Sequence, residues 1–316
     1  MRLRHALVLA ELARPDTSFR SPGLRLSAAR NDDAADLALL GRRIEELKAI
    51  HRIHGLVLPE VLLPGQRMRL SLMPEAFAET LHTELSGVLG IRPPSPNEKV
   101  PSSVFSHGVE VRAVNISREF TDSGYGDASR WSATLVGGRV FEFQEPLLSS
   151  ATPGQTFQSD VRWVDLGLSD QLSAARSPSR TVELAARELG SLVKIWLELV
   201  RGGGSTLWGK SRREAAPSSG GVDPLDAARR ESVVSRMLAD LGEMPGVDQP
   251  SERALWVAAL INPCGADGGA WPVLDIRLAV LTASTPLERL SVAKTGMVDS
   301  IYKLKGGFWP MNTYYW

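Results

Sequence analysis

Cysteine and histidine are scarce in this chain of 316 residues, which has one cysteine, Cys264, and five histidines. A single cysteine excludes an intramolecular disulfide and any zinc site built from several thiolates. His51 and His54 have a spacing that two metal ligands could use, but no third ligand is near them in the sequence. We interpret them as solvated residues at the end of a helix. No histidine stands beside a serine or cysteine in a nucleophile motif. We therefore expect no catalytic residue, no metal and no cofactor.

The sequence also lacks net charge and long apolar runs. Its 36 basic and 36 acidic residues cancel, so no overall field attracts it to nucleic acid or to an anionic membrane. The apolar stretch at 254–261 reads ALWVAALI and is followed by Asn262-Pro263. A membrane-spanning helix needs about 20 apolar residues, so we predict a buried core helix here instead. Neither nucleic acid nor a membrane is an expected partner.

The start of the chain bears on localisation. It contains Arg2, Arg4, Arg14 and Arg20 around a short apolar patch. A secretory signal requires about 7–15 apolar residues, which this patch does not provide. We expect a cytoplasmic protein, and the arginines leave import into an organelle as the alternative.

Hydrophobic periodicity divides the chain into a strand-rich half and a helical half. Residues 33–53 have helical spacing, and apolar residues then alternate with polar ones between 56 and 166, as in half-buried strands. After residue 180 the spacing is helical again, and Thr285-Pro286-Leu287-Glu288 forms a capping box. The predicted fold class is α+β. The predicted parts are an N-terminal arm and helix (1–54), a β-rich part (55–170), a helical part (171–305) with a flexible insertion (202–222), and an aromatic tail (306–316).

Several segments, in this order, resemble the LON substrate-binding domain. That domain is the N-terminal region of ATP-dependent Lon proteases and also occurs in LON-and-RING ubiquitin ligases and in cereblon. Its opening signature is two strands joined by a Pro-Gly turn and followed by an acidic-proline helix start. Residues 56–81 resemble this signature through Leu58-Pro59, Leu63-Pro64-Gly65 and Met73-Pro74-Glu75. Other similar segments are HGVEVRAVNI, LVGGRVFEF, SDVRWVDL, LADLGEMPG, ALWVAALINP and LDIRLAVLTASTPLERL.

The resemblance, over residues 56–304, implies a PUA-like β-barrel subdomain followed by an α-helical bundle. It also implies a noncatalytic module that binds unfolded or client polypeptides in protein quality control or regulated proteolysis. One strand of the family, which carries Gly-Arg-Phe after the first helix, is not evident, and a proline-rich segment, 91–103, stands in its place.

Other modules of these proteins are not expected in this chain. An AAA+ module and a Ser-Lys protease domain do not fit beside this domain in 316 residues, and one cysteine excludes a RING. We therefore predict that the chain is not an enzyme. The alternative is a subunit or fragment of a LON-RING ubiquitin ligase, so proteolytic or ubiquitin-ligase components are further candidate partners.

One motif indicates a different function. Residues 204–211, GSTLWGKS, match the P-loop pattern, whose backbone amides surround a phosphate while the lysine neutralises charge and the serine binds Mg²⁺. The nucleotide-binding residues would be Gly204, Gly209, Lys210 and Ser211. A P-loop needs a strand before the glycines, whereas a helical stripe precedes them here. A flexible loop is the preferred interpretation, and a small nucleotide-binding protein is the alternative.

Aromatic residues of the strand-rich half are the candidates for a peptide-binding groove: Trp131, Phe141, Phe143 and Trp163. Extended peptides dock on sheets through edges and apolar pockets. The competing interpretation places these four side chains in the core of the barrel. The tail is a second aromatic feature, because five of the last nine residues are aromatic; we expect it to dock onto the domain or to contact a partner.

Overall fold

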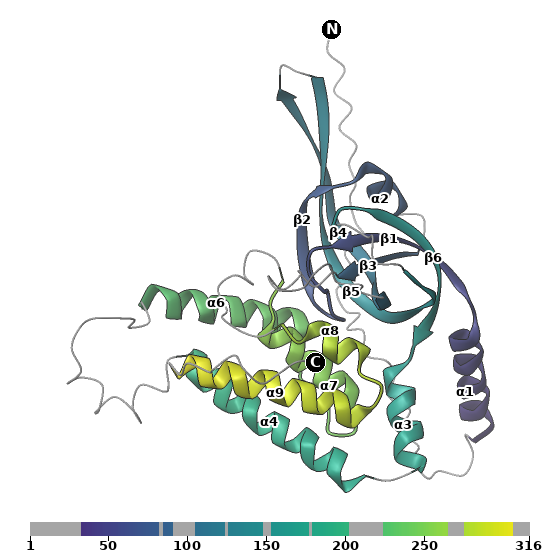
Figure 1. Ribbon diagram of the computed structural model, residues 1–316, viewed down its shortest axis with the longest axis vertical. Coiled ribbons are helices and arrows are strands. Elements are labelled where there is room, and N and C mark those ends of the chain that lie inside the picture. Colours follow the sequence, from purple (N-terminus) through teal and green to yellow (C-terminus); the bar gives the residue numbers. More distant parts are fainter. Residues whose placement is uncertain are drawn as a thin grey trace, which may run out of the picture.

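The computed structural model describes residues 33–81, 85–90, 105–123, 126–147, 153–176, 179–201, 224–264 and 275–305. Helix α1 (Asp33–Lys48) comes first in this part of the chain. It is followed by β1 (His51–Leu58), β2 (Arg67–Met73), α2 (Glu75–Thr80), β3 (Ser86–Gly90), β4 (Phe105–Ser123), β5 (Gly126–Leu147) and β6 (Thr156–Val164). The helices after the strands are α3 (Leu166–Arg176), α4 (Arg180–Val200), α6 (Pro224–Leu241), α7 (Pro250–Ile261), α8 (Arg277–Thr282) and α9 (Pro286–Leu304). Figure 1 shows the strands gathered on one side and α4 to α9 on the other, which confirms the predicted α+β class.

The strands form one sheet that closes partly on itself. Their order is β2-β5-β4-β3-β1-β6, and β6 pairs a second time, with β5. This last pairing runs from Val140 opposite Val164 to Phe143 opposite Val161. It closes β5, β4, β3, β1 and β6 into a ring, while β2 extends the sheet from β5 as an edge strand. Strands β1 and β3 are parallel, and the other described pairs are antiparallel.

The ring encloses a small core in which aromatic residues fill the space that glycines leave. The buried residues are Ile53, Val57, Leu89, Phe141, Phe143, Val161 and Trp163. A Cβ added at Gly87 on β3 would lie 2.7 Å from the ring of Phe141, and one at Gly108 on β4 would overlap the same ring. Because β5 does not pair with β3, Phe141 reaches β3 through the interior. The opposite face of the β5–β6 pair is exposed at Glu142 and Arg162.

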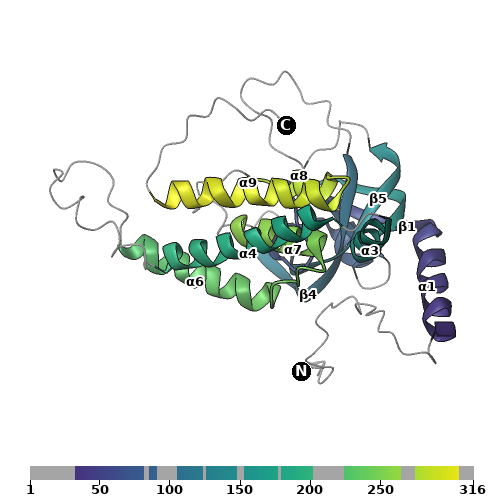
Figure 2. The same cartoon turned by 90° about the horizontal axis from the view of Figure 1, so that it is seen from below.

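Helix α7 lies at the centre of the helical half. Its residues 254–261 are all buried, and it contacts α3, α4, α6, α8 and α9. Helices α4 and α9 run side by side in Figure 2, and the indole of Trp196 on α4 donates to the hydroxyl of Ser300 on α9 at 2.7 Å. The apolar stretch of the sequence is thus a core helix, as predicted. In the part of the chain that the structure describes, every helix is too short or too polar to cross a bilayer.

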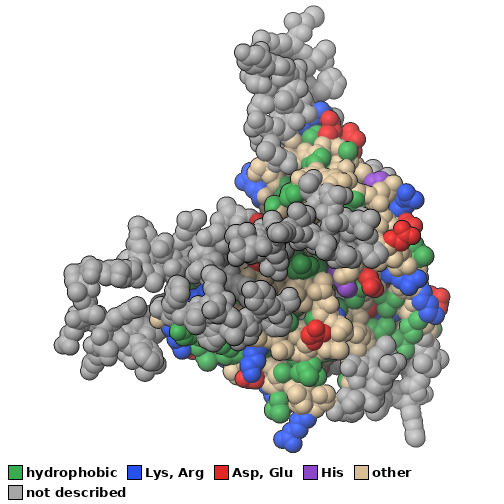
Figure 3. Space-filling view, viewed as in Figure 1, with side chains coloured by type: hydrophobic (Ala, Val, Ile, Leu, Met, Phe, Trp, Pro, Cys, Tyr) green, Lys and Arg blue, Asp and Glu red, His purple; other side chains and the backbone are tan. Residues whose placement is uncertain are grey.

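The described surface carries charges of both signs. Figure 3 shows basic and acidic side chains interspersed on the face that it presents, over the barrel as well as the helices. Exposed ion pairs contribute to this mixture, such as Lys294 on α9 with Glu188 on α4 at 2.8 Å. Pairs of this kind add little to stability. The balance of charge in the sequence is therefore also a balance on this face of the molecule.

Two expectations from the sequence are wrong. The helix predicted for residues 33–53 ends at Lys48, and β1 begins at His51. His51 and His54 are therefore strand residues, because pairing of β1 with β3 and β6 overrides the local helical spacing. The strand that was not evident after the first helix is β3, which directly precedes the proline-rich segment. Its sequence, SGVLG, contains two glycines, which weaken the strand signal.

Gln66, which is 3% exposed, joins the barrel to the helical half. Its side-chain oxygen accepts from the amide of Leu63 at 3.0 Å, and its amide nitrogen donates to the carbonyls of Ala259 and Asn262 at 3.0 and 2.8 Å. In a continuing helix the Ala259 carbonyl would accept from residue 263, but that residue is proline and has no N–H. The barrel therefore supplies the donor that the end of α7 lacks.

Gln66→Ala should destabilise the protein by about 2–5 kcal/mol, because three buried backbone groups lose a partner and each unsatisfied group costs about 1–3 kcal/mol. Urea denaturation measures this change in the free energy of unfolding. The control is Arg69→Ala at an exposed position of β2, which should stay within about 0.5 kcal/mol of the wild type. Equal stability of the two variants would show that this contact does not hold the halves together.

Candidate functional site

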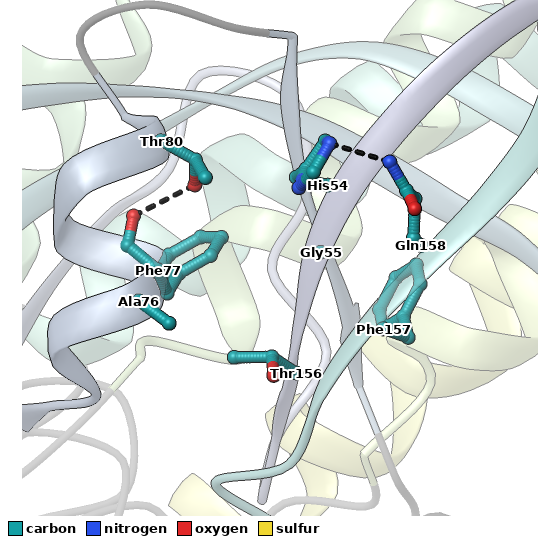
Figure 4. A pocket seen from close by; sticks show the side chains of 8 residues that line it. All are labelled: His54, Gly55, Ala76, Phe77, Thr80, Thr156, Phe157 and Gln158. Atoms are coloured by element: carbon teal, nitrogen blue, oxygen red, sulfur yellow. Dashed lines mark hydrogen bonds between the residues drawn. The ribbon is translucent and has the colours of Figure 1, made fainter.

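A pocket of about 260 Å³ opens between α2 and the strands β1 and β6. Its lining residues are His54, Gly55, Ala76, Phe77, Thr80, Thr156, Phe157 and Gln158. In Figure 4 the residues of α2 lie on one side of the space, and those of β1 and β6 lie on the other. The lining contains two phenylalanines and no Asp, Glu, Lys or Arg. Four of the eight lining residues are polar, so the walls of the pocket mix apolar surface with polar groups that carry no carboxylate, ammonium or guanidinium.

One wall depends on a glycine opposite an aromatic residue. Gly55 on β1 pairs with Phe157 on β6, and a Cβ at Gly55 would overlap the ring of Phe157. Only glycine thus lets this ring lie over the backbone of β1. The ring is also held by Phe143, whose centroid lies 5.7 Å away in an edge-on arrangement. Phe157 is therefore fixed between the core of the barrel and the pocket.

The opposite wall comes from α2, a short helix that begins after Pro74. Phe77 is 1% exposed and belongs to the main hydrophobic core, so it anchors α2 to the barrel. Thr80 donates from its hydroxyl to the carbonyl of Phe77 at 2.9 Å, at the last turn of the helix. Ala76 is exposed at the pocket. The position of this wall is consequently set by core packing and not by the polar groups at its rim.

A chain of hydrogen bonds orients the polar side of the pocket. Arg52 donates to the side-chain oxygen of Gln158 at 3.0 Å. The amide nitrogen of Gln158 then faces Nε2 of His54 at 2.7 Å. Arginine can only donate, so the oxygen of Gln158 must accept and its nitrogen must donate. Nε2 of His54 is the acceptor in this arrangement.

The lining residues of the pocket do not combine a nucleophile with a neighbouring base. The imidazole of His54 adjoins no serine, cysteine or carboxylate among the lining residues. The thiol of Cys264 lies outside the pocket, and burial raises its pKa to about 12, so the thiolate that would act as a nucleophile is absent near neutral pH. Among the residues that the structure describes, no three His, Cys, Asp or Glu side chains are grouped to hold a metal ion.

The four aromatic residues predicted for a groove do not line this pocket. Phe141, Phe143 and Trp163 are 0%, 5% and 5% exposed and lie in the core inside the ring. Trp131 is opposite Met73 where β2 ends, and the guanidinium of Arg118 lies 5.1 Å from its ring centroid. Burial favours the core interpretation for the first three.

The residues that do form the pocket were missed by the sequence analysis. Gly55, Ala76, Thr80 and Thr156 are small residues that carry no motif. The helix start at Met73-Pro74-Glu75 was the one signal that pointed towards α2. That signal predicted the position of the helix in the sequence, but it did not predict that β1 and β6 lie opposite the helix across a pocket.

The P-loop-like residues Gly204, Gly209, Lys210 and Ser211, and the aromatic tail at 306–316, lie outside the described residues. The described elements on either side of the motif are α4, which ends at Val200, and α6, which begins at Pro224. A helix therefore leads towards the motif, where a P-loop requires a strand. Nucleotide binding remains an untested prediction.

Comparisons with known proteins gave matches among solved structures. No family model matches the sequence, and no curated protein matches it. A Lon N-terminal domain protein from Xanthomonas campestris is similar in structure, with 17% identity and a TM-score of 0.35 over 77% of this chain and 97% of that chain. The N-terminal domain of a Lon protease from the Mycobacterium avium complex is similar with 14% identity and a TM-score of 0.39 over 79% of this chain and 99% of that chain. Both of these solved structures are of Lon N-terminal domains.

A buried acidic cluster joins α3 to the start of α7. Asp170 accepts from the amide and the hydroxyl of Ser251 at 2.9 and 2.6 Å. Burial raises the pKa of Asp170, although these hydrogen bonds lower it. Burial also raises the pKa of the neighbouring Glu252, and the negative charges of Asp170 and Asp165 raise it further.

A carboxyl group whose pKa is raised on folding binds more protons in the folded state. It contributes stability below its ordinary pKa of 4.5, and that contribution is lost as the pH rises through the raised value. Ionised Glu252 therefore lowers the free energy of unfolding near neutral pH.

Glu252→Gln should raise the melting temperature at pH 7, because a neutral amide avoids the cost of burying charge beside two carboxylates. The gain should shrink towards zero at about pH 4, where the wild-type carboxyl is itself protonated. Calorimetry at both pH values measures this. Glu198→Gln on the exposed face of α4 is the control and should change neither value. A gain of the same size at both pH values would contradict the electrostatic explanation.

Proposed function

We propose that this protein is a noncatalytic module that recognises extended polypeptides by inserting one apolar side chain into the pocket between α2, β1 and β6. The observation that carries the proposal is a pocket of about 260 Å³ that is lined by two phenylalanines and by polar residues, with no Asp, Glu, Lys or Arg among them. The sequence resemblance to the LON substrate-binding domain supports the same class of function.

The size of the pocket favours a side chain over a free small molecule. Sites for small molecules and cofactors usually measure about 300–1,000 Å³, and this pocket is smaller. Phe77 and Phe157 offer apolar contact of the kind that anchors single side chains in peptide-binding proteins. One anchored side chain with backbone nearby fits this volume better than a complete cofactor does.

The lack of charged lining residues also disfavours anionic ligands. Phosphorylated or carboxylated metabolites need a basic group or a helix N-terminus to offset their charge. The lining offers neither Lys nor Arg, and Arg52 already donates to Gln158. An uncharged, apolar side chain is therefore the preferred occupant.

Unfolded polypeptides are the corresponding partners, because folding buries the apolar side chains that this pocket would take. A role in quality control or regulated proteolysis follows by this reasoning and by the LON resemblance. A link to ubiquitin ligases is the narrower alternative, and no contact in the described residues favours it.

Filling the pocket should abolish recognition without harming the fold. Ala76→Trp places a large side chain at an exposed lining position and should weaken binding of a fluorescent, permanently unfolded polypeptide by about tenfold or more, equivalent to about 1.4 kcal/mol. Fluorescence anisotropy measures the dissociation constant, and a thermal melt checks that the variant folds.

The matched control is Glu79→Trp, which adds the same side chain at an exposed position of α2 outside the pocket. It should bind like the wild type. Equal affinity of the wild type for folded and unfolded clients would contradict the proposed function. Unchanged affinity in Ala76→Trp would show that recognition uses another surface.

A further inference from the structure

Strands β4 and β5 continue beyond the closed ring as a two-stranded arm. Their pairing runs without interruption from Ser117 opposite Ser132 to Ser123 opposite Gly126. Figure 1 shows this ribbon extending away from the barrel, at the end farthest from α4 to α9. An arm of this kind has two edges of backbone that need partners.

One edge of the arm belongs to β4. Strand β3 pairs with β4 only at Val109 and Glu110. From Val111 to Ser123, β4 pairs with β5 on one side and with no described strand on the other. An open strand edge is a template for another strand, and proteins commonly protect such edges with charges or bulges.

A bulge separates the arm from the barrel. The register of β4 against β5 shifts between Val114 and Ser117, and Asn115 within this interval has a φ of 58°. Asparagine tolerates this left-handed conformation better than most residues. The bulge leaves residues 117–123 as a regular segment of open edge.

The register shows which backbone groups point outward. Ser123 and Gly126 pair across two residues, and at this separation a pair must exchange both hydrogen bonds. Hydrogen-bonded and non-hydrogen-bonded pairs alternate in antiparallel strands. Arg118, Phe120 and Asp122 therefore occupy the positions whose N–H and C=O groups face away from β5.

The charges at these three positions allow the edge to pair with the same edge of a second copy. When two copies of this edge pair in antiparallel register about Phe120, Arg118 of each copy stands opposite Asp122 of the other. Opposite charges in directly facing positions stabilise a strand pair. The same register makes each facing pair a hydrogen-bonded pair, so three pairs exchange two hydrogen bonds each.

The geometry points to a second copy of this chain as the partner of the β4 edge, in an isologous dimer with a twofold axis at Phe120. The edge of β5 on the arm does not have this property, because Trp131 already pairs with Met73 of β2. The remaining outward positions of this edge, Asp127 and Ser129, offer no pair of opposite charges. Charge complementarity thus selects the β4 edge.

The root of the arm is compatible with this pairing. Arg118 forms an ion pair with Glu75 at 3.0 Å, and the two side chains remain 40% and 54% exposed. The guanidinium of Arg118 also lies 5.1 Å from the ring centroid of Trp131. An ion pair this exposed contributes little to stability, so Arg118 can exchange Glu75 for an aspartate of another copy. With few apolar residues at the contact, the dimer should be weak and depend on protein concentration.

Light scattering coupled to size exclusion tests the dimer over a concentration series. The wild type should rise from 34.3 kDa towards twice this mass. Arg118→Asp and Asp122→Arg should each remain monomeric, because each places like charges opposite one another in a homodimer. An equimolar mixture of the two variants should recover the doubled mass, since both aspartates of the first variant would then face arginines of the second.

Recovery in the mixture separates the pairing from a folding defect, because two misfolded variants would not restore each other. The matched control is Ser129→Arg, on the other strand of the same arm and opposite the uncharged Phe120, which should dimerise like the wild type. A wild type that stays monomeric at its highest soluble concentration would overturn the dimer, as would a mixture that fails to recover. Monomeric protein whose capture of unfolded polypeptide falls in Asp122→Arg would assign the edge to a client strand, and would also overturn it.

Discussion

The architecture depends on one constraint at the end of α7: a proline stands where the helix needs a backbone donor. Pro263 cannot bond the carbonyl of Ala259, and a buried carbonyl without a partner is costly. Gln66, at the entry to β2, donates to this carbonyl and to that of Asn262. The central helix therefore ends correctly only when the barrel is docked against it, which couples the two halves.

The two proposed binding surfaces, the pocket and the β4 edge of the arm, both lie on the barrel. Helix α2 contacts both of them. The first residue of that helix, Glu75, pairs with Arg118 at the root of the arm, while Phe77 and Thr80 face the pocket. The pocket is lined by no Asp, Glu, Lys or Arg and the arm carries alternating charge, so the two surfaces suit different occupants. A side chain of a client enters the first, and a strand of a second copy meets the second. Such a dimer would present two pockets to one extended client, which raises the effective concentration of the second site.

Local features of the sequence were sufficient to predict the helices of the second half and the class of fold. The stripe in α4, the apolar run of α7 and the capping box at Thr285 all concern residues within a few turns of one another. Thr285 accepts from the amide of Glu288, as the motif predicts. Glu288 accepts from the amide of Ser284, one residue before the cap. Alternation was equally reliable for β6, where Val161 and Trp163 are buried between exposed polar residues.

The sequence by itself thus determined the α+β class, the core helix at 254–261 and the alternating strands, because helix period, strand period and caps are local properties. Only the tertiary structure decided where β1 begins, that the glycine-containing segment at 86–90 is a strand, and that β6 closes the ring on β5. It also decided the pocket, in which Gly55 meets Phe157 about a hundred residues away. These features come from pairing between distant strands, and the small residues that permit such pairing carry no periodic signal of their own.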